Sequence, residues 1–290
     1  MKKLIKKISI LALIALPFVS CSSDDDSTTT PPVKNTIATI ASNNADLSIL
    51  VQALQKTDLV ATLDGSQEFT VFAPTNASFT AFLQANGFAN LDAVPTNVLK
   101  EILLNHVVAG ELTASALNTG YVKTLAKGSA SPTNTLSLFV NTANGVVLNG
   151  GTSNNGGTVV TADVQASNGV VHVINGVLAL PTIVNHAVAN PNFSILVQAL
   201  TREDQPDFAG ILSGTANSPF TVFAPTNEAF VNLLAELNLS GLADVPQEVL
   251  ENTLKYHNKN IYSKLGVTSR KQLLRFATLK RIRDEQISNT

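Results

Sequence analysis

Hydrophobic residues between positions 46 and 106 recur at helical spacing, which predicts three short helices. The apolar sets that define one face of each helix are Leu47, Leu50, Val51 and Leu54, then Phe79, Phe82 and Leu83, then Val98, Leu99, Ile102 and Leu103. Asp46, Asn76 and Thr96 are expected to cap these helices, because short polar side chains accept hydrogen bonds from the first turn. Between the first two helices, Glu68–Ala73 is rich in β-forming residues and stops at Pro74, which predicts a strand.

From Tyr121 onward the pattern changes to short apolar runs separated by turns rich in Asn and Gly. These runs predict strands at Leu136–Val140, Val146–Leu148, Thr158–Thr161, Val170–Ile174 and Val177–Leu180. Helices grouped ahead of strands are typical of the α+β class, because each kind of element then packs as its own layer. The fold class predicted for this part of the chain is therefore α+β.

A long stretch of the sequence occurs twice. Ser48–Leu54 recurs as Ser194–Leu200, Phe69–Asn76 recurs as Phe220–Asn227, and Val94-Pro95 and His106 have counterparts at Val245-Pro246 and His257. The offset is 146 residues for the first match and 151 for the others, so a five-residue insertion falls between Arg202 and Ser218. A period this long indicates a duplicated domain, because solenoid repeats are far shorter. The second copy is expected to keep a strand at Phe220–Ala224, although no later segment repeats the strands of the first copy.

The N-terminus has the pattern of an export signal. Lys2, Lys3, Lys6 and Lys7 precede the apolar run Ile8–Val19, which is too short to span a bilayer. The run ends at Cys21, the single cysteine of the chain. Phe18-Val19-Ser20-Cys21 resembles a bacterial lipobox, which implies a signal peptide at residues 1–20 and a lipid on Cys21. The alternative is an ordinary signal peptide that happens to contain a cysteine.

Residues 21–35 are small, polar or acidic and include two prolines, so they are expected to form a flexible, lipidated tether. The serine and three acids just after Cys21 resemble the signal that sends lipoproteins of the Bacteroidetes to the outer face of the outer membrane. This resemblance implies that the chain is held at the cell surface by its N-terminal lipid, which makes the membrane its first expected partner.

Three sequence blocks resemble the fasciclin family. They are Phe69–Asn76 with Phe79 behind it, then Asn105-His106, then Gly169–Leu178, in family order and at domain-scale spacing. The resemblance covers residues 36–181 completely and 182–257 in part, so the second domain is expected to be truncated. It implies an α+β fold in which a twisted β-wedge packs against a helical layer, and a role in adhesion or extracellular binding.

The C-terminal residues 258–290 form a basic tail, expected to be helical. Residues 259–290 contain eight basic and two acidic residues, although the whole chain has a net charge of −2. Residues 253–277 resemble the end of a LuxR-type helix-turn-helix domain, but the positioning helix that should precede it is missing. The preferred interpretation is a fused or mis-assembled coding sequence whose tail carries no selected function. The alternative is a basic amphipathic helix at Ser269–Ile287 that only looks similar. A DNA-binding regulator is the least favoured interpretation, since nucleic acid is an improbable partner for an exported protein with an acidic body.

No catalytic motif, cofactor-binding loop or metal-ligand spacing occurs in the sequence, so no enzymatic activity, cofactor, metal or catalytic residue is expected. His106 and His172 are interpreted as core histidines held by hydrogen bonds. The leading hypothesis is a non-enzymatic lipoprotein that binds an extracellular protein or polysaccharide through fasciclin-like domains. The alternative is a polysaccharide-associated envelope lipoprotein, which the absence of Trp and the presence of only three Tyr disfavour.

Overall fold

The computed structural model of the chain describes residues 35–204, 206–214 and 219–246. The expected signal peptide, Cys21, the tether as far as residue 34 and the expected basic tail lie outside these ranges. Within them, no helix is long and apolar enough to cross a membrane. The described residues up to 181 are called the first repeat below, and those from 182 to 246 the second repeat.

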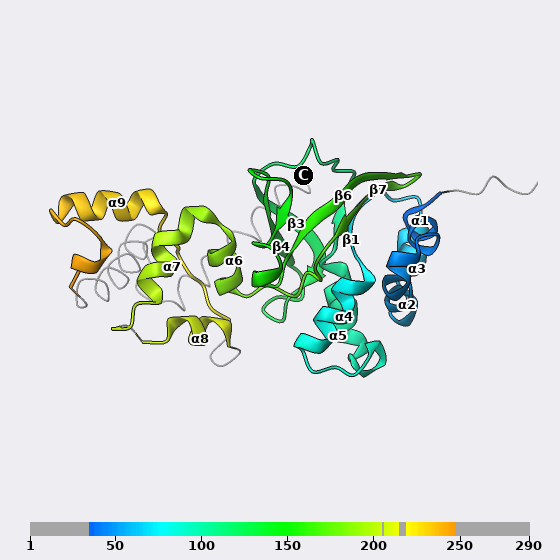
Figure 1. The fold of residues 1–290 in the computed structure, drawn as a ribbon, viewed down its shortest axis with the longest axis horizontal. Helices are drawn as coiled ribbons and strands as arrows, with labels where there is room; N and C mark the ends of the chain where they lie inside the picture. Colours follow the sequence, from blue (N-terminus) through cyan, green and yellow to red (C-terminus); the bar gives the residue numbers. More distant parts are fainter. Residues whose placement is uncertain (1–34, 205, 215–218, 247–290) are drawn as a thin grey trace, which may run out of the picture. The chain divides into compact units, whose positions relative to one another are not determined.

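The helices of the first repeat form where the apolar spacing predicts them. The predicted three are α2 (Ser48–Lys56), α4 (Asn76–Ala85) and α5 (Thr96–Leu104), and two shorter ones, α1 (Ile37–Ser42) and α3 (Val60–Asp64), accompany them. The predicted face of α5 is buried through Leu99, Ile102 and Leu103. Figure 1 shows all five helices outside the barrel, next to the strands at the start and end of the sheet.

None of the three predicted helix caps forms. Asp46 lies inside a 3₁₀ turn, Ala45–Leu47, whose capping side chain is Asn44. The cap of α4 is Thr75, which accepts a hydrogen bond from the Ser78 N–H. No side chain caps α5, which follows Pro95 directly. Asn44 and Thr75 thus make the capping bonds predicted for Asp46 and Asn76, and Thr96 makes none.

Seven strands close into a barrel, in the order in which they follow along the chain. They are β1 (Phe69–Pro74), β2 (Val107–Ala109), β3 (Gly120–Lys127), β4 (Thr135–Asn141), β5 (Val147–Leu148), β6 (Gly157–Ala166) and β7 (Gly169–Ile174). Neighbouring strands run antiparallel, except that β1 and β7 pair in parallel and so close the barrel. The predicted α+β class is confirmed, and the barrel with its outer helices corresponds to the expected wedge and helical layer.

The strand predicted at Val177–Leu180 does not form. The segment is irregular, although Val177 and Leu178 are buried. Because β1 and β7 already pair with each other, the barrel offers this segment no free strand edge. Its backbone is instead fixed by single hydrogen bonds, such as the one from the Ala179 N–H to the Asn155 carbonyl at 3.1 Å.

The core of the first repeat has two parts, separated by the wall formed by β1 and β7. Side chains alternate across a strand, so Val71 and Ala73 of β1 pack with the helices, whereas Phe72 packs inside the barrel. By the same alternation in β7, Val171 packs against the helices and Ile174 packs inside the barrel. These two strands therefore join the two parts of the core.

The second repeat contains the helices α6 (Ile183–Ala189), α7 (Ser194–Leu200), α8 (Phe208–Ser213) and α9 (Asn227–Glu236). The strand expected at Phe220–Ala224 does not form, although its sequence is identical to that of β1. A strand needs neighbours, and none of the seven strands of the described residues lies in the second repeat. This part of the prediction is wrong because tertiary context, not sequence alone, decides whether the segment is a strand.

Both repeats contain the same asparagine clasp. Asn76 accepts from the Ile49 N–H at 2.9 Å and donates to the Ala45 carbonyl at 2.9 Å and the Ser48 hydroxyl at 3.0 Å, so it ties α4 to the start of α2. Asn227 ties α9 to the start of α7 through the equivalent three bonds. Because the Asn76 side chain is used in these bonds, it does not cap its own helix. The two equivalent clasps confirm that the repeat in sequence is also a repeat in structure.

Asn76→Ala should lower the free energy of unfolding of the first repeat by roughly 2 kcal/mol, because three hydrogen bonds are lost, one of them partly buried. Urea denaturation measures the loss. Asn86→Ala is the matched control, since Asn86 is exposed at the other end of α4 and makes one bond within its own helix. Equal losses for the two variants would contradict the role given to the clasp.

Candidate functional site

His172 lies buried in the middle of β7 with both ring nitrogens engaged. Nε2 is 2.8 Å from the Leu112 carbonyl oxygen, and Nδ1 is 3.2 Å from the Asp163 N–H nitrogen that donates to it. Since Nδ1 accepts and the carbonyl requires a donor, the ring is the neutral tautomer protonated on Nε2. The ring also stacks on Phe72, with the ring centres 5.5 Å apart. His172 is thus a core residue that holds two other segments in place.

Asp163 belongs to an irregular stretch of β6, where its backbone has a positive φ of 59°. Its carboxylate Oδ1 accepts a hydrogen bond from the Ala114 N–H at 2.7 Å. The same oxygen is 3.9 Å from Nδ1 of His172, but that nitrogen is already an acceptor for the Asp163 N–H. The side chains of Asp163 and His172 therefore do not share a proton.

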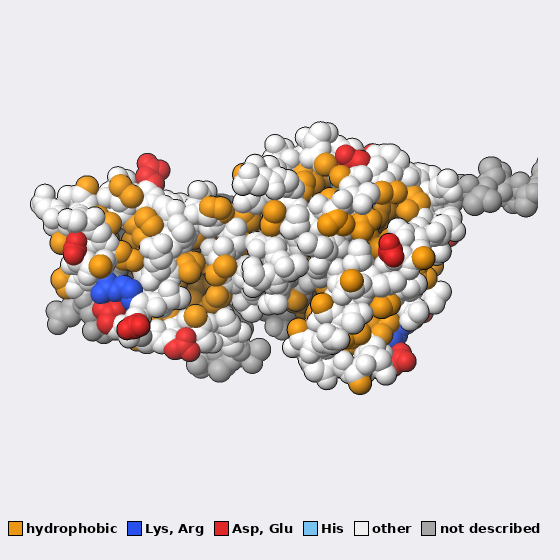
Figure 2. Space-filling model, viewed as in Figure 1, with side chains coloured by type: hydrophobic (Ala, Val, Ile, Leu, Met, Phe, Trp, Pro, Cys, Tyr) orange, Lys and Arg blue, Asp and Glu red, His pale blue; other side chains and the backbone are white. Residues whose placement is uncertain are grey.

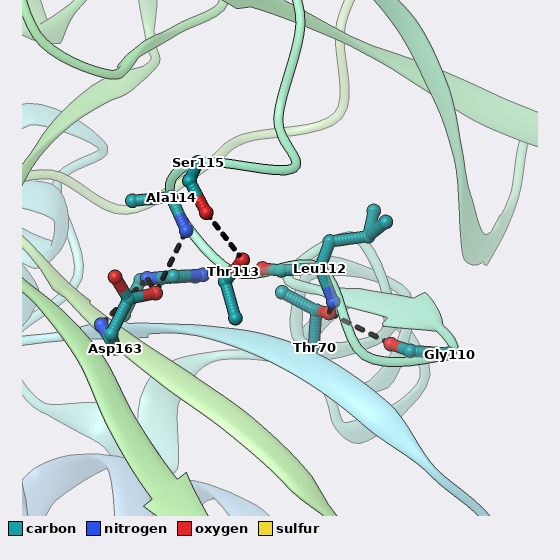
Figure 3. Close-up of polar contacts among 8 residues, drawn as sticks. Thr70, Gly110, Leu112, Thr113, Ala114, Ser115 and Asp163 are labelled. Atoms are coloured by element: carbon teal, nitrogen blue, oxygen red, sulfur yellow. Dashed lines mark hydrogen bonds and ion pairs between the residues drawn. The ribbon is translucent and has the colours of Figure 1, made fainter.

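Thr70 of β1 completes the attachment of the 110–115 loop. Its hydroxyl donates to the Gly110 carbonyl at 2.7 Å and accepts from the Leu112 N–H at 2.8 Å. Figure 3 shows Thr70 and Asp163 reaching the loop from different strands. Side chains from β1, β6 and β7 thus fix one six-residue loop at three points.

The arrangement holds the 110–115 loop in place. The imidazole of His172 is buried and has no free nitrogen, so it cannot serve as a general base for a substrate. Within the described ranges, no three metal-ligating side chains come together. What the loop exposes is a small polar surface formed by Glu111, Ser115 and the neighbouring Asp163. This surface, called the loop surface below, is a candidate for binding.

Thr70→Val should release the loop while preserving side-chain volume. The Gly110 carbonyl and the Leu112 N–H lose their partner, so the exchange protection of the loop amides should fall by roughly tenfold or more. Hydrogen exchange measured by NMR tests this. Thr80→Val is the control, because Thr80 is exposed on α4 and bonds within that helix. Unchanged protection at Leu112 would contradict the attachment.

The pair Asn105-His106 performs a similar task at the end of α5. Nδ1 of His106 donates to the Ile102 carbonyl at 2.7 Å, and Nε2 accepts from the Leu178 N–H at 2.9 Å. Asn105 donates to the carbonyls of Leu178 and Ala179. Burial lowers the pKa of His106 from 6.5 to about 4, although the bond to Ile102 opposes the shift. The interpretation of His106 and His172 as hydrogen-bonded core histidines is confirmed.

His186, on α6, differs from these two histidines. Its ring meets Tyr121 edge to face with the centres 5.6 Å apart, and burial lowers its pKa. Its buried Nδ1 has no hydrogen-bond partner within the described part of the chain. His257 and the expected lipidation site Cys21 lie outside that part, so their roles stay predictions.

Sequence reasoning missed Thr70 and Asp163. Thr70 lies inside the block that resembles the fasciclin family, but nothing in a strand sequence shows that a threonine hydroxyl holds a loop 40 residues away. Asp163 lies two residues after the predicted strand Thr158–Thr161, and an acid at such a place usually indicates a turn. A structure was needed to bring the two together.

The Fasciclin domain family model matches residues 45–181 and 191–286, which is more than half of the chain. Protein sll1483 of Synechocystis sp. is 41% identical over 148 residues, which cover 50% of this chain and 74% of that protein. Cell surface glycolipoprotein MPB83 of Mycobacterium bovis is 40% identical over 92 residues, 29% of this chain and 40% of its own length.

Among solved structures, the FAS1 domain pair from the insect cell adhesion molecule fasciclin I aligns with a TM-score of 0.42 and 20% sequence identity. The alignment covers 66% of this chain and 64% of that one. The family assignment rests on the match of the family model to both repeats, together with the barrel and outer helices described above. The chain belongs to the fasciclin domain family.

Proposed function

We propose that the chain is a non-enzymatic cell-surface protein that mediates adhesion or extracellular binding through its fasciclin domains. The observation that carries the proposal is the match of both repeats to the fasciclin family model. The similarity to a mycobacterial cell surface glycolipoprotein agrees with it. The engaged ring nitrogens of His106 and His172 also agree, because the core histidines hold segments of the fold and are not available to a substrate.

The loop surface is the proposed contact region on the first repeat. It joins exposed carboxylates and a hydroxyl on a backbone that is fixed at three points, so little conformational freedom is lost when a partner binds. Loops held rigidly by a scaffold commonly carry binding function. Glu111 and Ser115 supply the groups that a partner would meet, since Asp163 is partly used to hold the loop.

Attachment of bacteria to a coated surface tests this role. A strain that lacks the gene should attach less, and the wild-type gene should restore attachment. Glu111→Lys combined with Ser115→Arg should fail to restore it, because the two changes invert charge and add bulk on the loop surface. Glu203→Lys, an exposed charge reversal in the second repeat, is the control. Full restoration by the loop variant would remove the loop surface from the proposal, and unchanged attachment without the gene would contradict adhesion itself.

The second part of the proposal is that a lipid on Cys21 holds the protein in the outer membrane, facing outward. Cys21 is the single cysteine and follows the apolar run of the export signal. Stable attachment needs two or more acyl chains, because one chain binds a membrane only marginally. Cys21→Ala should therefore move most of the protein from the membrane fraction to the soluble fraction, as followed by immunoblotting. A variant that sediments with membranes as fully as the wild type would contradict the anchor.

A further inference from the structure

One sequence has two environments in this chain. The hexapeptide Phe-Thr-Val-Phe-Ala-Pro forms β1 in the first repeat and recurs at Phe220–Pro225 in the second. Val71 and Phe72 are 3% and 0% exposed, whereas their counterparts Val222 and Phe223 are 38% and 41% exposed. Within the described ranges, residues 220–224 pair with no strand. The second copy is therefore an apolar segment with strand-forming sequence and no strand neighbour in the described structure.

An apolar cavity of about 250 Å³ lies beside this segment. It is formed by side chains of α6, α7, α8 and the segment itself, including Ile183, Leu196, Leu200, Leu212, Val222 and Ala224. For comparison, a cavity of roughly 150 Å³ lined by apolar side chains binds benzene. Figure 2 shows hydrophobic side chains exposed in the area where Figure 1 places these helices. Contiguous exposed apolar surface of this kind commonly marks a binding site.

The first repeat shows what covers the equivalent surface. Val71 pairs with Val171 and Ala73 pairs with Val173, both in β7. Val171 is buried and Val173 partly buried in the cluster that contains Leu50 of α2. The cavity is lined by the counterparts of Val71, Ala73 and Leu50, namely Val222, Ala224 and Leu196. The cavity therefore lies against the counterparts of residues that, in the first repeat, pair or cluster with the two valines of β7.

We propose that the second repeat binds an extended segment of another polypeptide chain, which pairs in parallel with residues 220–224. The occupant would place two β-branched apolar side chains, two positions apart, in the cavity opposite Val222 and Ala224. It would place glycine opposite Phe220, because in the first repeat a Cβ on Gly169 would overlap the Phe69 carbonyl oxygen. The expected partner sequence therefore resembles β7, with a glycine followed by two β-branched apolar residues two positions apart.

A strand explains the observations better than a small apolar molecule. A small molecule could fill the cavity, but it would not pair with the backbone of residues 220–224, whose identical counterpart in the first repeat pairs with β2 and β7. An added strand satisfies both requirements, since the main chain supplies hydrogen bonds and alternate side chains enter the cavity. Val222 and Phe223, which correspond to the buried Val71 and Phe72 of β1, are among the large hydrophobic residues that are most exposed in the described structure.

The test uses the full chain carrying Cys21→Ala, so that no lipid or detergent competes for the cavity. A fluorescent peptide with the sequence of Asn168–Asn175 is titrated against it and followed by anisotropy. The control peptide carries Val171→Asp and Val173→Asp. We expect saturable binding of the first peptide, and at least roughly tenfold weaker binding of the second, because each carboxylate would enter an apolar cavity. Hydrogen exchange should slow at residues 220–224 and stay unchanged in β1, whose edges are already paired.

A matched pair of protein variants locates the site. Val222→Asp should weaken binding of the peptide by roughly tenfold or more, since its side chain lines the cavity. Val231→Asp, on the exposed side of α9 and outside the cavity, should leave binding unchanged. Both positions are partly exposed, and circular dichroism checks that helix content is kept.

Three outcomes would overturn the proposal. One is the absence of peptide binding, as expected if residues 247–290 of the same chain cover the segment. Another is equal binding of the two peptides. The third is that an apolar dye binds in the cavity and the peptide does not displace it. This result would indicate a site for small apolar molecules.

Discussion

Gly169→Ala should destabilise the first repeat by roughly 4 kcal/mol or more. Gly169 begins β7 with φ of +131°, a conformation that alanine adopts only with strain. An added Cβ would also overlap the carbonyl oxygen of Phe69 and lie 2.8 Å from its nitrogen. These are backbone atoms of the paired strand, so no side chain can rotate away. The overlap can be relieved only by separating β1 from β7, the pair that closes the barrel and joins the two parts of the core.

Urea denaturation of the full chain measures this loss. Gly145→Ala is the matched control, because Gly145 has φ of +82° but no atom within 4 Å of the added Cβ. The control should lose only the cost of the strained backbone, roughly 1–2 kcal/mol. Similar losses for the two variants would show that close packing of the strands contributes little at Gly169.

The sequence pattern was sufficient where structure is local. The face of α5 is set by the spacing of Leu99, Ile102 and Leu103, and their burial follows that spacing. The strands β4 and β7 likewise follow apolar runs between turns. Helix caps were harder, because Thr75 and Asn76 are both suitable caps and only the contact of Asn76 with α2 decides between them.

Strand pairing lies beyond what local pattern can show. Val177–Leu180 and Phe220–Ala224 both have strand-forming sequences, and neither forms a strand. The first lacks a free edge because the barrel is closed, and the second has no neighbouring strand among the described residues. Conversely, β2 is only three residues long and was not predicted, but it forms because it lies between β1 and β3. A strand is therefore a property of a sheet more than of a segment.

The candidate site could be predicted only in part. The burial of His106 and His172 follows from their places in apolar patterns, and both were interpreted as hydrogen-bonded core residues. Their partners could not be found in the sequence, since the Leu178 N–H lies 72 residues from His106 and the Leu112 carbonyl lies 60 residues from His172. Contacts at such separations depend on how the barrel closes, and this depends on the pairing of β1 with β7.

Acidification should destabilise the first repeat through His106. Burial lowers the pKa of this histidine to about 4 in the folded protein, while the unfolded chain keeps a value near 6.5. Above pH 6.5 neither state binds the proton, so the histidine does not change stability. Below pH 6.5 the unfolded state binds a proton that the folded state does not bind. The free energy of unfolding therefore falls by about 1.4 kcal/mol per pH unit. The fall ends near pH 4 and amounts to roughly 3 kcal/mol in total.

The difference between the wild type and His106→Phe isolates this contribution, because every other titratable group is the same in the two proteins. Urea unfolding at pH values from 7 to 4 can be followed by a brief hydrogen-exchange pulse at one fixed pH, read in peptides that cover β1 and β7. The variant should be less stable than the wild type at pH 7, since it loses the bonds to the Ile102 carbonyl and the Leu178 N–H. The difference in free energy of unfolding between the two proteins should shrink as the pH falls from 6.5 to about 4. Over this range only the wild type loses stability through His106, because its buried ring stays neutral while the unfolded chain binds a proton. A gap that stays constant from pH 7 to pH 4 would mean that His106 is protonated equally in the folded and unfolded states, which its burial between α5 and the Leu178 segment should prevent.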